Sequence, residues 1–104
     1  MFVAISTLQV PEEAAKELEE RFLNRSRKVD GYEGFIRLRL LRRRGSHTQY
    51  AFVTEWASQA AFQAYMKSHD YGDAHAKVPP EFDAVIENLG LAVYDAVVDS
   101  ARGE

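Results

Sequence analysis

Two hydrophobic periodicities divide the chain into strands and helices. In residues 2–10 (FVAISTLQV) apolar side chains occupy both alternating faces, which predicts an inner strand. Pro11 and the two glutamates after it suit the first turn of a helix. The apolar stripe that follows predicts that this helix continues to Val29. The turn sequence DGYEG, residues 30–34, ends it.

The middle of the chain predicts a β-hairpin. Residues 35–45 and 49–56 alternate as strands do, and the short connection GSHT contains a glycine, so we expect the two strands to pair antiparallel. Arg37 and Arg39 share one face of the first of these strands. We expect them to form ion pairs with an acidic residue of another strand, Glu55 or Asp95, or with a partner subunit; the functional alternative is that they bind an anion.

A second helix is predicted over residues 58–69, with Ser58 as its N-cap. Apolar and aromatic side chains recur at three- and four-residue spacing along it, which places them on one side. Asp70 and Gly72 are expected to interrupt this helix. A short turn then carries His75, and residues 77–82 are expected to form a loop.

Residues 91–98 predict the last strand, so the order of elements is β-α-β-β-α-β. This is the α+β, ferredoxin-like split βαβ fold: a four-stranded antiparallel sheet with both helices on one face. The other face still carries large apolar side chains, and such a patch usually marks an interface. We therefore expect a homodimer whose sheets pack face to face, a dimeric α+β barrel. Residues 1–99 form the single expected domain, and 100–104 a flexible tail.

Composition and charge exclude several kinds of protein. The 104 residues carry a formal net charge of −3, which argues against a general nucleic-acid binder. The chain has no cysteine, which excludes disulfides, thiolate metal sites and cysteine catalysis. No apolar run approaches the ~20 residues of a membrane span, and the first residues lack the basic region of a signal peptide. We expect a cytoplasmic protein with no membrane or nucleic-acid partner.

The residues that could carry chemistry gather in AFQAYMKSHDYGDAHAK, residues 61–77. Of the three histidines, His47 lies in the predicted hairpin loop, remote from the others, so a three-histidine metal site is not expected. His75 could bind a haem iron alone or be a surface or capping histidine. Tyr65 could line a pocket or pack in the core. Ser6 shares a strand face with apolar residues, so its hydroxyl needs a partner if that face is buried.

Over about residues 3–98 the sequence resembles the antibiotic biosynthesis monooxygenase superfamily, whose members are small dimeric ferredoxin-like proteins. It is most similar to the branch of haem-degrading monooxygenases. The resemblance rests on the order and spacing of four segments: VPEEAAKELEERFLNRS, GFIRLRLLR, FVTEWASQAAFQAY and AHAK.

The resemblance implies roles for particular residues. His75 falls at the place of the axial histidine that binds haem iron. Tyr65 stands where the branch carries a tryptophan that helps distort the haem, and Ser6 where it carries an asparagine that helps hydrogen-bond the iron-bound oxygen species. Three residues of the first predicted helix match a segment near the family's haem pocket: Arg21, Phe22 and Arg25.

Three functions remain open at this point. The first is haem binding through His75, with oxidative breakdown of the haem by means of an external electron donor. The second is a cofactor-independent monooxygenase of an aromatic polyketide or quinol, with Tyr65, Ser6 and Trp56 near the pocket. The third is a non-catalytic dimer that binds a small ligand.

Overall fold

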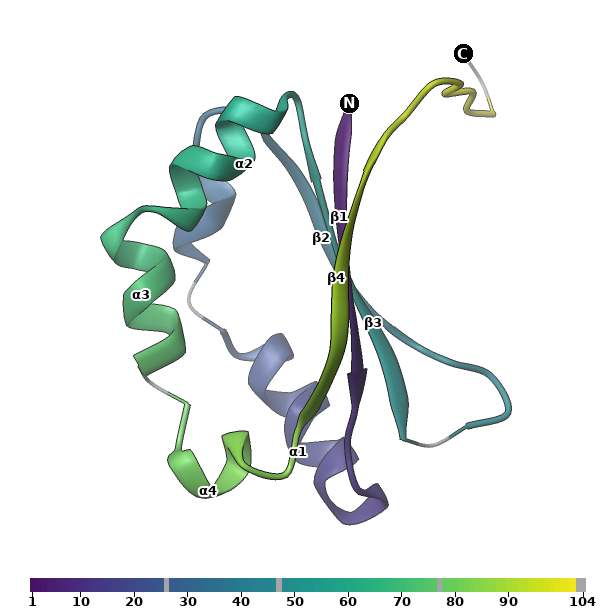
Figure 1. Ribbon diagram of the computed structural model, residues 1–104, viewed down its shortest axis with the longest axis vertical. Helices are drawn as coiled ribbons and strands as arrows, with labels where there is room; N and C mark the ends of the chain where they lie inside the picture. Colours follow the sequence, from purple (N-terminus) through teal and green to yellow (C-terminus); the bar gives the residue numbers. More distant parts are fainter. Residues whose placement is uncertain (26, 47, 77, 103–104) are drawn as a thin grey trace.

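A single antiparallel sheet carries its helices on one face (Figure 1). The structure is a computed structural model; it describes residues 1–25, 27–46, 48–76 and 78–102, and for residues 73–76 it describes the backbone alone. Within these ranges the elements follow one another along the chain as β1 (Phe2–Gln9), α1 (Glu12–Leu23), the 3-10 helix η1 (Lys28–Gly31), β2 (Phe35–Arg42), β3 (Gln49–Trp56), α2 (Gln59–Met66), α3 (His69–Ala76), α4 (Pro80–Asp83) and β4 (Glu87–Asp95).

The sheet has the strand order β2-β3-β1-β4, and every neighbouring pair is antiparallel. The first and last strands of the chain therefore lie side by side, with β1 inside the sheet as its apolar faces predict. This topology confirms the ferredoxin-like split βαβ fold and the hairpin of β2 and β3.

Cross-strand pairs show which residues face the helices, because residues directly opposite each other in a sheet project to the same side. Phe2 lies opposite Trp56, and the ring of Phe62 in α2 lies 5.3 Å from the Phe2 ring and 6.0 Å from the Trp56 ring. The even-numbered residues of β1 and β3 therefore face the helices. The odd-numbered residues, among them Val3 and Val53, project to the open face.

The buried side chains form two clusters between the sheet and the helices. One lies beneath α1 and includes Val10, Leu18 and Tyr50. The other lies beneath α2 and η1 and is centred on Trp56, which has no exposed surface. Burying a large aromatic side chain stabilises a fold by several times the thermal energy, so Trp56 holds α2 and η1 to the sheet.

The prediction that the first helix continues to Val29 is wrong, because α1 ends at Leu23. The backbone N–H of Asn24 and its side-chain Nδ2 both donate to the carbonyl of Glu20, at 2.9 and 3.0 Å. Asparagine favours such local bonds over continuing a helix. Val29 lies instead in η1, where it is buried.

The second predicted helix is two helices. Ser58 caps α2 as predicted, since its side chain accepts a hydrogen bond from the helix's first turn. The break falls at Ser68, whose hydroxyl donates to the carbonyl of Tyr65 (2.6 Å) and accepts an N–H from the start of α3 (3.2 Å). The expected interruption at Asp70 and Gly72 is wrong, because both lie inside α3, as does the backbone of His75.

Two predictions near the C-terminus are also wrong. The loop expected over residues 77–82 contains the start of α4, which begins at Pro80. The last strand begins at Glu87 and not at residue 91. An irregularity in the pairing of β1 with β4 accommodates Gly90 at a φ of +131°, and the Asn88 side chain accepts the Gly90 N–H at 2.9 Å.

The face of the sheet opposite the helices is open (Figure 1). Arg37 and Arg39 lie there at 3.4 and 3.7 Å from the Glu55 carboxylate, which confirms the predicted pairing within the sheet. Tyr94 projects to the same face and is 53% exposed. No helix in the described ranges is long and apolar enough to cross a membrane.

Candidate functional site

Tyr65 is the centre of an aromatic cluster between the sheet and α3. Its ring stacks on Trp56, with centroids 5.5 Å apart and planes 27° apart. The rings of Tyr32 and Tyr71 meet it edge to face at 5.0 and 5.6 Å. Burial, together with the neighbouring Tyr32, raises the pKa of the Tyr65 phenol, so this hydroxyl stays protonated at neutral pH.

A hydrogen bond ties η1 to α3 beside this cluster. The Tyr32 hydroxyl donates to Oδ2 of Asp70 at 2.8 Å, and the Lys28 ammonium lies 3.6 Å from Oδ1 of the same carboxylate. Lys28 of η1 and Tyr32, the residue after η1, thereby hold the first turn of α3. Because His75 lies in that helix, these contacts fix the backbone that carries it.

Ser6 lies near the middle of β1 and faces the helix side of the sheet. Across the strands it is opposite Phe52 and Leu91. The Phe52 ring contacts the ring of Phe22 in α1, with centroids 5.1 Å apart. Leu91 is nevertheless 52% exposed, so the helices leave the sheet beside Ser6 partly uncovered.

A pocket of about 640 Å³ lies between the C-terminal half of α1 and the strands β2 and β3. Its apolar lining includes Phe22, Leu38 and Leu40, and its charged lining includes Arg25 and Arg27. This size is within the usual range for small-molecule sites, which are mostly apolar with a few placed polar groups. The lining also contains Glu19 and Glu20, but basic residues outnumber them, so the pocket suits a partly apolar ligand that carries negative charge.

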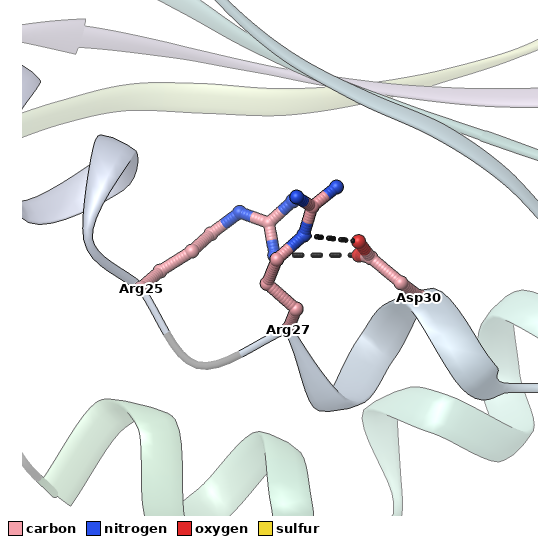
Figure 2. Close-up of polar contacts among 3 residues, drawn as sticks. All are labelled: Arg25, Arg27 and Asp30. Atoms are coloured by element: carbon pink, nitrogen blue, oxygen red, sulfur yellow. Dashed lines mark hydrogen bonds and ion pairs between the residues drawn. The ribbon is translucent and has the colours of Figure 1, made fainter.

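The two arginines of the pocket share one carboxylate (Figure 2). Arg25 lies 3.3 Å from Asp30 and Arg27 donates to it at 2.8 Å. Burial opposes ionisation of Asp30, but the hydrogen bonds and charges of Arg27 and Arg25 outweigh it and hold its pKa below the usual value. The group of three thus carries a net charge of +1. A ligand carboxylate would bring the opposite charge to this group.

A second polar group lies on the same pocket. The Tyr50 hydroxyl donates to Glu19, which also pairs with Arg42 at 3.2 Å. Burial and the Glu19 carboxylate raise the pKa of Tyr50 to about 12, and the bond from Tyr50 together with Arg42 lowers the pKa of Glu19. Sequence reasoning missed this group because 31 positions separate Glu19 from Tyr50 and neither stands in a motif.

The structure distributes the predicted site residues over three places. Phe22 and Arg25 line the pocket, whereas Tyr65 lies in the aromatic cluster and Ser6 on the sheet floor next to Phe52. Arg21 projects elsewhere: its guanidinium lies 4.8 Å from the centre of the Phe82 ring and pairs with Glu17.

The side chain of His75 is outside the described part of the structure, as is the whole of His47, so the axial role of His75 stays a prediction. Among the residues that are described, no three histidine, aspartate or glutamate side chains gather into a metal site.

Comparison with known proteins gives the family. The family model "Antibiotic biosynthesis monooxygenase" matches residues 1–77. The curated haem oxygenase (mycobilin-producing) of Mycobacterium tuberculosis is 41% identical over 63 residues, a segment that spans 61% of this chain and 60% of that protein. The haem-degrading monooxygenase of Bacillus mycoides is 28% identical over 100 residues, 94% of this chain and 92% of that protein.

Solved structures match over nearly the whole chain. The haem degrader MhuD of Mycobacterium tuberculosis, with two haems bound in its active site, superimposes with a TM-score of 0.80 and 33% identity, covering 97% of this chain and 100% of that one. The cofactor-independent oxygenase SnoaB of Streptomyces nogalater, as a mutant, gives a TM-score of 0.75 at 17% identity, covering 99% and 97% of the two chains. At that identity the likeness to SnoaB shows the fold alone.

Proposed function

The chain belongs to the antibiotic biosynthesis monooxygenase family, and within it we propose that the protein binds haem through His75 and breaks it down oxidatively with electrons from an external donor. The observation that carries the proposal is the pocket beneath α1, which combines apolar walls with the paired guanidinium groups of Arg25 and Arg27. Relatives that match this chain are named for the same chemistry.

The residues of the pocket fit a porphyrin. Haem is a flat apolar ring whose edge carries two carboxylates. Phe22, Leu38 and Leu40 offer apolar surface for the ring, and the net positive group of Arg25, Arg27 and Asp30 offers a site for a carboxylate. The fit is chemical as well as spatial, since a cavity without cations would leave the carboxylates unpaired.

Each residue of the proposed site has one task. His75 holds the iron, and Tyr65, supported from behind by Trp56, presents an aromatic surface to the macrocycle. Ser6 donates a hydrogen bond on the side of the sheet, close to the Phe22–Phe52 contact that borders the pocket. Haem, when bound, supplies oxygen binding and activation at its iron. The protein's own contribution is to orient the ring and to limit access of water.

We also propose that the open face of the sheet is a homodimer interface. It carries apolar and aromatic side chains, including Val3, Leu41 and Tyr94, and no helix of the described chain covers it (Figure 1). Contiguous apolar surface of this kind is rare on monomers. A twofold arrangement would bury the same patch on both copies.

Haem titration tests the proposal. Haemin added to the purified protein is expected to give a saturable shift of the Soret band at about one haem per chain. His75→Ala should abolish or greatly weaken this shift, whereas His69→Ala, a change in the first turn of the same helix, should preserve it. The absence of a saturable shift in the wild-type protein, or equal shifts in both variants, would contradict haem ligation by His75.

A further measurement separates a degrader from a carrier. Under air, a reductant should cause the Soret band of the complex to decay, and a stable band would leave haem binding without degradation. If no haem binds, oxygen uptake with quinol and anthrone substrates tests the cofactor-independent activity.

Haem dimethyl ester, which has no free carboxylate, should bind more weakly than haem to the wild-type protein, and Arg25→Gln should remove most of that difference.

A further inference from the structure

Three oxidisable rings lie in direct contact between the sheet and the surface. Trp56 is completely buried, Tyr65 stacks on it with centroids 5.5 Å apart, and Tyr32 meets Tyr65 at 5.0 Å. Tyrosine and tryptophan are the protein side chains that most readily lose one electron reversibly. Rings in van der Waals contact exchange electrons far faster than rings separated by solvent or aliphatic side chains.

The end of this series has a proton acceptor. A phenol that loses an electron becomes a strong acid, so its oxidation is easiest where a base can take the proton at once. The Tyr32 hydroxyl donates to the Asp70 carboxylate at 2.8 Å, an ordinary length for an O–H···O hydrogen bond, so the proton acceptor is already in place. The Lys28 ammonium at 3.6 Å from the other carboxylate oxygen helps to hold Asp70 in this orientation.

We propose that Tyr32 is a redox-active tyrosine that gives its electron by way of the Tyr65 ring and its phenol proton to Asp70. In this step Tyr32 loses one electron and one proton and becomes a neutral phenoxyl radical. Asp70 gains the proton and becomes a neutral carboxylic acid. A one-electron oxidant gains the electron, so charge and atoms balance.

In the protein the oxidant is the haem site after reaction with hydrogen peroxide, and this part rests on the proposed function. Hydrogen peroxide takes up two electrons; haem bound at the site would supply one of them, and Tyr32 would supply the other. The hydroxyl belongs to the residue that follows η1, and its acceptor belongs to α3.

Tyr50 provides a matched comparison. Its phenol also donates to a carboxylate, that of Glu19, and its surroundings are even more buried. Within the described residues, however, the ring contacts that join Trp56, Tyr65 and Tyr32 do not extend to Tyr50. If a carboxylate partner alone made a tyrosine redox-active, Tyr50 would behave as Tyr32 does.

A photochemical experiment without haem tests the proposal. Tris(bipyridine)ruthenium(III), generated by a laser flash with a sacrificial quencher, removes one electron from the protein, and transient absorption follows the tyrosyl radical. Tyr94→Phe serves as the reference, because Tyr94 lies on the opposite face of the sheet, apart from the ring contacts of Tyr32 and Tyr65, and its own radical would obscure the signal. In this reference protein, the additional change Tyr32→Phe should abolish most of the remaining radical signal. The additional change Tyr50→Phe, made separately, should preserve it.

Asp70→Asn tests the proton step. In the reference protein it should slow the appearance of the radical at least about tenfold, since a positioned proton acceptor commonly contributes on the order of 100-fold or more. Circular dichroism would establish that each variant is folded. An undiminished radical in Tyr32→Phe, or an unchanged rate in Asp70→Asn, would overturn the proposal.

Electron paramagnetic resonance of the haem complex with one equivalent of peroxide gives the second readout. A tyrosyl radical should appear in the wild-type protein and disappear in Tyr32→Phe. Failure of the proposed function is distinguishable: a chain that binds no haem but passes the ruthenium test retains its redox-active tyrosine. A chain that binds haem but fails the ruthenium test retains only the haem site.

Discussion

Gly34 and Gly45 offer a paired test of how α2 is positioned against the sheet. Both glycines have a left-handed backbone, with φ of +83° and +81°. They differ in their surroundings. A Cβ at Gly34 would lie 2.5 Å from Cβ of Ala61 in α2, closer than real Cβ atoms approach, whereas a Cβ at Gly45 would meet nothing within 4 Å.

The expected cost of alanine at each position follows from these contacts. Both variants share the strain of a left-handed residue, about 1–2 kcal/mol, and the same entropic gain in the unfolded chain. Gly34→Ala adds the overlap with Ala61, on the order of 1–3 kcal/mol for overpacking. We therefore expect Gly34→Ala to lower the free energy of unfolding by about 1–3 kcal/mol more than Gly45→Ala.

Urea unfolding followed by circular dichroism measures both variants, and thermal unfolding checks them, since each kcal/mol corresponds to roughly 4–8 °C in Tm for a domain of this size. The double variant Gly34→Ala with Ala61→Gly removes the overlap but keeps the backbone strain, so it should recover most of the extra loss. Equal stabilities of the Gly34 and Gly45 variants, within about 0.5 kcal/mol, would refute the close approach of α2 to the start of β2.

Three further outcomes follow from charge and surface. Because burial and Glu19 raise the pKa of Tyr50 from 10.0 to about 12, its contribution to stability is present below about pH 10 and lost as the pH rises toward 12. Urea unfolding measured below and above pH 10 should show a smaller loss of the free energy of unfolding for Tyr50→Phe than for the wild-type protein. The pKa of Asp30 is lowered from 3.8, so its contribution to stability is present above that pH and is lost on further acidification. In Asp30→Asn the free energy of unfolding should depend less on acid pH, with a difference of about 1 kcal/mol or less. Tyr94→Arg on the open face should convert a dimer to monomers in light scattering, whereas Leu23→Arg, on the exposed helix surface, should not.

Local patterns predicted the elements whose determinants are local. Alternation along residues 2–10 and 49–56 predicted β1 and β3 to within a residue, and Ser58 predicted the start of α2. Alternation also placed Arg37 where it could pair with Glu55, one of the partners that the sequence left open, and the two residues project to the same face of neighbouring strands.

The errors have physical causes that a single segment does not show. Asn24 and Ser68 end helices through bonds to nearby carbonyls, and the hydrophobic stripe continues past both positions. The contacts at the candidate site join distant residues: Tyr32 bonds Asp70 across 38 positions of the chain. Such pairs have no periodicity, so only the folded chain shows them.

The most direct test of the proposed haem site is a crystal structure of the protein grown with haemin, with the iron located by its anomalous scattering. We expect one iron peak per chain between the helix layer and the sheet, within bonding distance of His75 and with the ring edge toward Arg25. An iron peak on the open face of the sheet, or a His75 ring turned to bulk water beside a pocket filled by its own side chains, would contradict it.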